Sequence, residues 1–250
     1  MGNLLSSRQQ IAERIESKRL RLVAWLRDEV YTDYQTAAKV LGVTPATAYK
    51  ALGTMERDNL VERHPVGRSS VWSLTVTGQL TYLADGDDPL GVFDPRVSEV
   101  TVRHTLAIQQ ARLAGEAAGW SDWISERRMR KSAATAKQAG KATGLLRIPD
   151  GLATSPGGRR VAIEVERTAK TPKRYEGIIA DYLQMRKAGL IHEVHYVCDT
   201  DRLAAGLSRL FRATKSVKIN GTDIALKEPH YDVFKFYGSN VWPACVSGNV

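Results

Sequence analysis

A short stretch in the first quarter of the chain constrains the fold more than any other. Thr32 or Asp33 can cap a helix, and Gly42 follows at a point where a helix must turn sharply. Thr44 can cap a second helix with Pro45 at its first position, where the missing proline N–H leaves no hydrogen bond unmade. We therefore expect two short helices joined by a tight turn.

The second of these helices has one apolar side and one exposed side. Helical spacing places Ala48, Leu52 and Met55 on the buried side. Its exposed amino end carries Ala46, Thr47, Tyr49 and Lys50. Two helices joined by a tight, glycine-containing turn are the signature of a helix-turn-helix, whose second helix enters the major groove of DNA. We expect Thr47, Tyr49 and Lys50 to face base edges.

Two short strands follow the helix-turn-helix. Residues 60–66 and 70–76 have the pattern of a hairpin with a basic tip. A two-stranded wing at this place resembles the winged helix-turn-helix of bacterial regulators. The resemblance implies that Arg63, His64 and Arg68 lie against DNA phosphates. The alternative is a small domain that mediates only protein contacts.

The charge balance points to the same kind of partner. The 250 residues contain 36 Lys and Arg against 27 Asp and Glu, and the resulting net charge of +9 favours polyanions, above all double-stranded DNA. No apolar run approaches the ~20 residues that span a bilayer, so we expect no membrane insertion. The two cysteines cannot form a disulfide framework or a thiolate zinc site, and we expect a cytoplasmic protein.

The chain divides into two expected domains. Residues 8–29 have the spacing of an amphipathic helix, which opens a first domain at residues 1–84. Residues 85–96 are rich in Asp, Gly and Pro and lack periodicity, which is typical of a linker. We place the second domain at residues 97–250 and expect it to end in a loosely packed tail.

The second domain mixes helices and strands. The expected elements are a helix at residues 97–119, strands at 120–130, 144–150 and 158–168, a helix at 172–189 and a strand at 191–200. This αβββαβ order predicts a mixed α/β fold of the α+β kind. One right-handed crossover helix would join the last two strands.

Acidic residues gather on the expected sheet although the chain is basic. Side chains alternate along a strand, so Glu164 and Glu166 share one face beside the small Ala162. Asp150 reaches the same place if its strand forms a hairpin with the next. Three converging carboxylates repel each other unless they are protonated or bind a cation, and Mg²⁺ and Mn²⁺ prefer oxygen ligands. On a DNA-binding chain, such a metal site is suited to phosphodiester cleavage.

The acids also fit a known motif. Pro149-Asp150, followed by the E-x-E of residues 164–166, resembles the PD-(D/E)xK nucleases, whose restriction-endonuclease-like core has the αβββαβ order. The resemblance implies a metal-dependent endonuclease in which these three acids are the catalytic metal ligands. The last acid stands where the motif has lysine, and Lys170 or Lys173 can supply the missing positive charge.

Four short segments carry a closer resemblance. They are RHTLAI, the W-x-x-E of Trp123–Glu126, RIPDG and AIEVERT. Together with the preceding winged helix they resemble the replication-relaxation family, which includes the MobC-type plasmid relaxases. The resemblance implies a strand-specific nick at a plasmid transfer origin, made in a complex with accessory mobilisation or coupling proteins. Glu126 and His104 are lesser candidates for the catalytic site.

The stretch from Arg127 to Pro149 contains no acid. Its basic residues are Arg127, Arg128, Arg130, Lys131, Lys137, Lys141 and Arg147. We expect a mobile loop that follows DNA phosphates beside the acids. A merely solvated loop is the alternative.

Other interpretations stay open. His192 and His195 face opposite sides of a strand and cannot share one ion, so we expect one to be buried and one to lie near the acids. Tyr175 and Tyr182 are expected to pack rather than act as covalent nucleophiles. The functional alternatives are a non-catalytic replication or transcription regulator with a degenerate nuclease-like domain, and a second domain that only dimerises. Homodimerisation stays open for each of these functions.

Overall fold

The computed structural model describes residues 2–82, 97–139 and 145–243, with side chains from residue 7 onward. The chain forms two compact units, Met1–Gln109 and Gln110–Val250. The expected linker at residues 85–96 lies outside the described residues. The boundary between the two units, at Gln109–Gln110, falls inside the helix expected at residues 97–119, which was predicted to lie wholly in the second domain.

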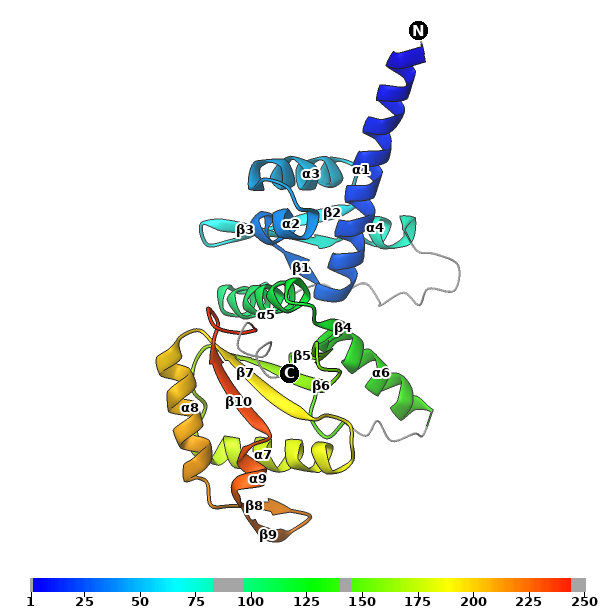
Figure 1. Ribbon diagram of the computed structural model, residues 1–250. Coiled ribbons are helices and arrows are strands. Elements are labelled where there is room, and N and C mark those ends of the chain that lie inside the picture. The colour runs from blue at the N-terminus through cyan, green and yellow to red at the C-terminus, as the bar shows by residue number, and fades with distance from the viewer. Residues whose placement is uncertain (1, 83–96, 140–144, 244–250) are drawn as a thin grey trace. The chain divides into compact units, whose positions relative to one another are not determined.

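The first unit consists of helices and a small antiparallel sheet (Figure 1). Its elements are α1 (Gly2–Glu29), β1 (Tyr31–Thr32), α2 (Tyr34–Leu41), α3 (Pro45–Arg57), β2 (Val61–Val66), β3 (Ser69–Leu74) and α4 (Val76–Thr81). The strands lie in the order β1-β3-β2. The predicted order of a helix, a helix-turn-helix and a hairpin is confirmed.

Local interactions of the helix-turn-helix also follow the prediction. Asp33 caps α2 and accepts a hydrogen bond from the amide of Thr36 at 2.7 Å. Gly42 ends α2 at φ +65°, a left-handed conformation that a residue with a Cβ atom disfavours. The side chain of Thr44 accepts a hydrogen bond from the amide of Thr47 at 3.3 Å and caps α3.

The wing is a tight hairpin. β2 and β3 pair from Val61 opposite Leu74 to Val66 opposite Ser69. The turn therefore contains only Gly67 and Arg68, and Gly67 adopts φ +56°. A left-handed first turn position matches the twist of a two-residue hairpin, which explains the glycine.

Helix α5 (Glu99–Ala117) contributes its first part to the first unit. The side-chain amide of Gln109 donates a hydrogen bond to the carbonyl of Tyr31 at 2.6 Å, and the Thr32 hydroxyl donates to Gln109 Oε1 at 2.9 Å. The hydroxyl groups of Tyr31 and Thr105 lie 3.0 Å apart. These bonds explain why the unit extends to Gln109.

The second unit is built on a five-stranded mixed sheet (Figure 1). Its elements after α5 are β4 (Ser121–Ser125), α6 (Glu126–Gln138), β5 (Gly151–Thr154), β6 (Arg160–Glu166), α7 (Pro172–Lys187), β7 (Glu193–Cys198), α8 (Asp201–Ala213), β8 (Ser216–Ile219), β9 (Thr222–Ala225), α9 (Glu228–Tyr231) and β10 (Phe234–Gly238). The sheet order is β10-β7-β6-β5-β4. The pairs β4–β5 and β5–β6 are antiparallel, whereas β6–β7 and β7–β10 are parallel. The predicted αβββαβ order is confirmed, with α6 inserted after the first strand.

Two strand predictions were wrong in their bounds. The strand predicted at 120–130 ends at Ser125, whose side chain accepts a hydrogen bond from the Arg128 amide at 3.4 Å and caps α6. A serine cap favours a helix where alternation alone suggests a strand. The strand predicted at 144–150 is not formed among its described residues; instead β5 begins after Asp150 and pairs with β6.

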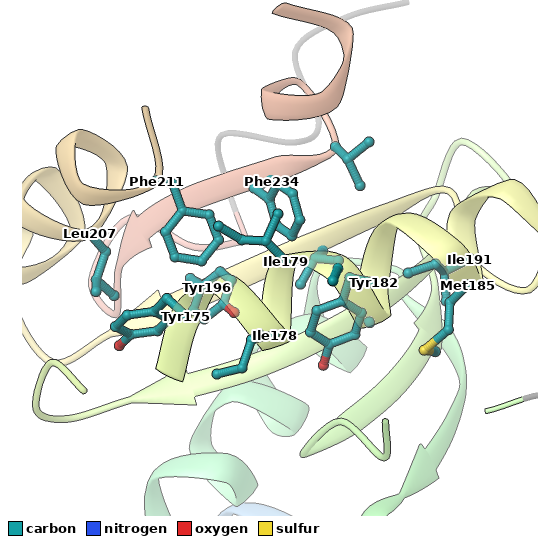
Figure 2. Packing of buried hydrophobic residues seen from close by; sticks show 14 of the residues in the cluster. Tyr175, Ile178, Ile179, Tyr182, Met185, Ile191, Tyr196, Leu207, Phe211 and Phe234 are labelled. Carbon is teal, nitrogen blue, oxygen red and sulfur yellow. The ribbon is translucent and has the colours of Figure 1, made fainter. Parts of the chain in front are cut away.

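A buried aromatic cluster joins α7, the sheet and α8 (Figure 2). It includes Tyr175, Tyr182, Tyr196, Phe211 and Phe234. The five elements from α8 to β10 have no counterpart in the sequence analysis. The loose tail expected at residues 238–250 is corrected for its described part, because Trp242 is only 3% exposed and its ring packs against that of Trp120; residues 244–250 lie outside the described residues.

Candidate functional site

Asp150 and Glu164 lie on neighbouring strands of the second unit. Asp150 immediately precedes β5, and Glu164 is on β6. Because Gly151 pairs with Ile163, the two acids occupy adjacent cross-strand positions. The amide of Val165 donates a hydrogen bond to Asp150 Oδ2 at 2.8 Å, which fixes Asp150 against β6. Asp150 and Glu164 are each partly exposed as whole residues, although the carboxyl group of Glu164 itself is turned into buried surroundings.

The electrostatic surroundings of Glu164 favour its protonated form. Burial of its carboxyl group is the main cause, and repulsion from Asp150 adds to it, so that the pKa rises to about 8. The hydrogen bond from Tyr182 and the charges of Arg147 and Lys170 act in the opposite direction. A bound cation would stabilise the ionised form of Glu164.

Glu166 is compensated within the protein. Lys170 forms an ion pair with its carboxylate, and the hydroxyl of Tyr175 donates a hydrogen bond to it at 3.0 Å. The same hydroxyl accepts a hydrogen bond from the amide of Lys170 at 3.1 Å. Glu166 is only 6% exposed. Its charge is therefore already balanced by Lys170.

The predicted convergence of three acids is not found. Among the residues that the structure describes, no group of three or more His, Cys, Asp or Glu side chains is placed to hold a metal ion. Glu166 follows Glu164 on the same face of β6. Lys170, in the loop after β6, forms an ion pair with the carboxylate of Glu166. Asp150 and Glu164 alone still fit Mg²⁺ or Mn²⁺. Mg²⁺ often takes one or two protein carboxylates and completes its shell with water and phosphate oxygens.

The other predicted catalytic residues are spread over several elements. Lys170 lies beside the acids, whereas Lys173 is exposed in the first turn of α7. Glu126 was expected on a strand but begins α6, where it forms an ion pair with Arg130. His104 belongs to the first unit, and Asp150 and Glu164 belong to the second.

Three residues near the acids had no such role in the sequence analysis. Tyr182 donates a hydrogen bond to Glu164, and Tyr175 donates one to Glu166. Both tyrosines are buried, as predicted, and Figure 2 shows them on one side of α7. Their seven-residue spacing, two helical turns, was the available signal. Arg147 forms an ion pair with Asp181 at 3.4 Å and lies over the ring of Tyr182.

Helix α3 of the first unit presents part of the predicted DNA surface. Lys50 is exposed, and Tyr49 is 44% exposed. The ring of Tyr49 packs edge-on between Tyr34 and Trp72, with centroid distances of 5.8 and 5.7 Å. Thr47 is half-buried, and its hydroxyl lies 2.9 Å from that of Thr44. Tyr49 and Lys50 are therefore exposed as predicted, whereas Thr47 is engaged by the cap residue Thr44.

The wing residues differ in how far they are engaged within the hairpin. Arg63 donates a hydrogen bond to the Ser70 hydroxyl at 2.9 Å, and its guanidinium lies over Trp72. His64 Nε2 lies 2.8 Å from the Ser73 hydroxyl. Arg68 is exposed in the turn. Of these side chains, Arg68 is the best placed to reach a phosphate.

The basic stretch after Ser125 is mainly helical rather than a loop. Residues 126–138 form α6, and residues 140–144 lie outside the described part of the chain. Met129 anchors the helix in the apolar core. The basic residues of α6 are Arg127, Arg128, Arg130, Lys131 and Lys137. Burial of Met129 explains the correction, because one apolar residue among the bases gives the helix a side that packs.

The two histidines of β7 and the preceding loop have separate partners. His195 is buried, with Nε2 3.0 Å from Glu193 Oε2 and Nδ1 accepting a hydrogen bond from the indole of Trp242 at 3.2 Å. His192 is exposed, and its Nδ1 accepts a hydrogen bond from the amide of Arg160 at 2.9 Å. Arg160 begins β6, whereas Glu164 is near the end of that strand. The expectation of a histidine near the acids is therefore wrong for His192.

Within the described residues, no helix has the length and apolar character required to cross a membrane.

Comparisons with known proteins identify the family. The replication-relaxation family model matches residues 23–198, and no curated protein matches. Among solved structures, a mutant of ZitR from Lactococcus lactis in the apo form is 24% identical over 32% of this chain, with a TM-score of 0.25. RV1404 from Mycobacterium tuberculosis is 18% identical over 55% of this chain, also with a TM-score of 0.25. This chain spans 63% of the ZitR chain and 89% of the RV1404 chain.

The family match covers most of the helix-turn-helix unit and the sheet strands up to β7, including both Asp150 and Glu164. It extends over more than half of the sequence. The chain belongs to the replication-relaxation family.

Proposed function

We propose that this protein is a metal-dependent DNA endonuclease of the relaxase type, which nicks plasmid or mobile-element DNA at a specific origin. Its family suggests a role in replication or mobilisation. The observation that carries the proposal is the Asp150–Glu164 pair. The two residues lie opposite each other on adjacent strands, and burial together with repulsion from Asp150 raises the pKa of Glu164, whose ionised form a bound cation would stabilise.

Asp150 and Glu164 would hold Mg²⁺ or Mn²⁺. When bound, the cation polarises a phosphodiester and lowers the pKa of a water molecule. Asp150 is oriented for this task by the amide of Val165, and Glu164 by the hydroxyl of Tyr182. Lys170, which is close enough to lower the pKa of Glu164, would take the place of the motif lysine only by turning its ammonium group from Glu166 to the phosphate.

Double-stranded DNA would bind to the winged helix. Lys50 on α3 and Arg68 in the turn of the wing are exposed cations of the first unit. Helix α6 adds basic residues in the second unit. Accessory mobilisation or coupling proteins, and a second copy of the chain, are further proposed partners.

A specific observation favours a second candidate, a DNA-binding regulator without catalytic activity. Lys170 already neutralises Glu166, so one of the three motif acids is unavailable to a metal in this arrangement. A regulator would need only the winged helix. Nicking of supercoiled plasmid that carries the cognate origin separates the two functions.

The nuclease proposal predicts open-circle product with Mn²⁺ or Mg²⁺ and none with EDTA. Tight DNA binding without nicking in several divalent metals would favour the regulator.

The DNA surface gives a separate prediction. The double variant Lys50→Ala, Arg68→Ala should bind DNA more weakly, and the slope of log affinity against log salt should fall by about 0.9 for each lost phosphate contact. Fluorescence anisotropy at several salt concentrations measures this slope. The variant Arg8→Ala, Arg14→Ala removes the same charge from exposed positions on α1 and serves as the control. Equal slopes for the two variants would contradict the assignment.

A further inference from the structure

The second unit contains a cavity that is separate from the Asp150–Glu164 pair. It has a volume of about 990 Å³, and its lining comes from the end of α7, the start of β7, the β8–β9 hairpin and the segment around α9. Asp150 and Glu164, and the residues that form hydrogen bonds with these two acids, are not part of the cavity lining. Arg159, which lies next to the first residue of β6, lines the cavity, whereas Glu164 and Glu166 are near the other end of that strand.

One wall of the cavity is apolar. It is formed by Leu183, Ile219, Ile224 and Val233, which come from α7, β8, β9 and the residue before β10. Binding pockets for small ligands commonly combine an apolar wall of this kind with a few well-placed polar groups. Aliphatic side chains of this kind can pack against an organic ring.

Two cations at the cavity lack a competing acid. Arg186 and Lys187 lie in the last turn of α7, are exposed, and form no ion pair within the described part of the chain. The cavity also contains two acids. Glu193 forms an ion pair with Arg159 at 3.0 Å and contacts His195, whereas the nearby Arg212 is paired with Glu228 at 2.8 Å rather than with Asp232. An anionic ligand would therefore meet Arg186 and Lys187 as uncommitted charges.

Two imidazole groups add hydrogen-bond donors. His192 Nδ1 accepts from the amide of Arg160, and His230 Nδ1 accepts from the amide of Lys227, each at 2.9 Å. In a neutral imidazole only one nitrogen carries the proton, so these bonds place it on Nε2 of both rings. Neither Nε2 has a hydrogen-bond partner among the described residues, and both histidines line the cavity.

We propose that this cavity is a nucleotide site. The base would lie on the apolar wall, and Arg186, Lys187 and the Nε2–H groups of His192 and His230 would bind the phosphate. The nucleotide could come free from solution or as one unit of a single DNA strand, since both present the same ring and phosphate. The site requires no metal, so it goes beyond the proposed nuclease function and stands apart from it.

Binding is tested in EDTA with two probes, thymidine 5′-monophosphate and a 5′-phosphorylated octathymidylate. Two-dimensional NMR follows the imidazole signals of the five histidines, and His192→Gln and His230→Gln assign the two that matter. We expect both signals to move with at least one probe. Movement with the monophosphate identifies free nucleotide as a ligand, and movement with the oligonucleotide alone identifies a strand. The histidine readout also separates this site from DNA bound at the winged helix.

The variant Arg186→Gln, Lys187→Gln should weaken binding of that probe by about tenfold or more, because hydrogen bonds to a charged phosphate are lost. Arg202→Gln, Arg209→Gln removes the same charge from exposed positions on α8 and should leave the affinity unchanged. The proposal is overturned if neither histidine signal responds, if both double variants bind alike, or if inorganic phosphate binds as tightly as the monophosphate. Each of these results is independent of plasmid nicking.

Discussion

Replacing Glu164 by Gln, or Asp150 by Asn, should lower the rate of plasmid nicking by about 10²–10³-fold, the range that follows loss of one electrostatic contact to a transition state. Each change removes a carboxyl group that can bind the cation in its ionised form but keeps the shape of the side chain. Glu164→Gln retains an oxygen that accepts the hydrogen bond of Tyr182, and Asp150→Asn retains one for the amide of Val165. The fold should therefore persist, and initial rates in Mn²⁺ measure the effect.

The matched control is Glu176→Gln, which removes one negative charge from an exposed position on α7. It should nick plasmid at the wild-type rate. Circular dichroism of each variant verifies that the fold is intact. Nicking that survives both Glu164→Gln and Asp150→Asn would place the chemistry elsewhere in the chain.

The apparent affinity for Mn²⁺ should rise by about tenfold per pH unit up to about pH 8 and level off above it. Burial and the neighbouring Asp150 raise the pKa of Glu164 to about 8, so below that pH a proton must leave before the cation can bind. Above the pKa no proton competes, and the dependence ends. Nicking rates at subsaturating Mn²⁺, measured from pH 6 to pH 9, report this profile.

Tyr182→Phe provides a control for which the direction of the change in the pH profile can be predicted. The hydrogen bond from Tyr182 lowers the pKa of Glu164, and its loss should move the break in the profile to higher pH. Tyr182 is buried, and phenylalanine keeps its ring in the core. A flat profile in the wild type, or a break that Tyr182→Phe leaves in place, would show that Glu164 does not control cation binding.

The elements that the sequence predicted well are those determined by local chemistry. Asp33, Gly42 and Thr44 each act on backbone groups within a few residues, so their roles can be inferred without the tertiary fold. The alternation of residues 161–166 likewise predicted which side chains of β6 share a face. Adjacency of Asp150 and Glu164 followed from the expected hairpin, although β5 begins one residue later than that strand was expected to end.

The predictions that failed depend on interactions distant in sequence or on competing local signals. Glu126 could continue a strand or begin a helix, and the cap from Ser125 together with burial of Met129 decides for the helix. Convergence of the acids failed because Lys170 binds Glu166, a pairing that the strand period does not determine. The role of Tyr182 depends on how α7 packs on the sheet, which becomes visible only in three dimensions.

The central claim is that Asp150 and Glu164 together hold one divalent cation. Titration of Mn²⁺ into the DNA-free protein at pH 8.5, followed by electron paramagnetic resonance of free Mn²⁺, tests it most directly. We predict one bound ion in the wild type and in Glu176→Gln, and loss of that ion in Glu164→Gln and in Asp150→Asn. An equal number of ions, held with equal affinity in all four proteins, would contradict the claim.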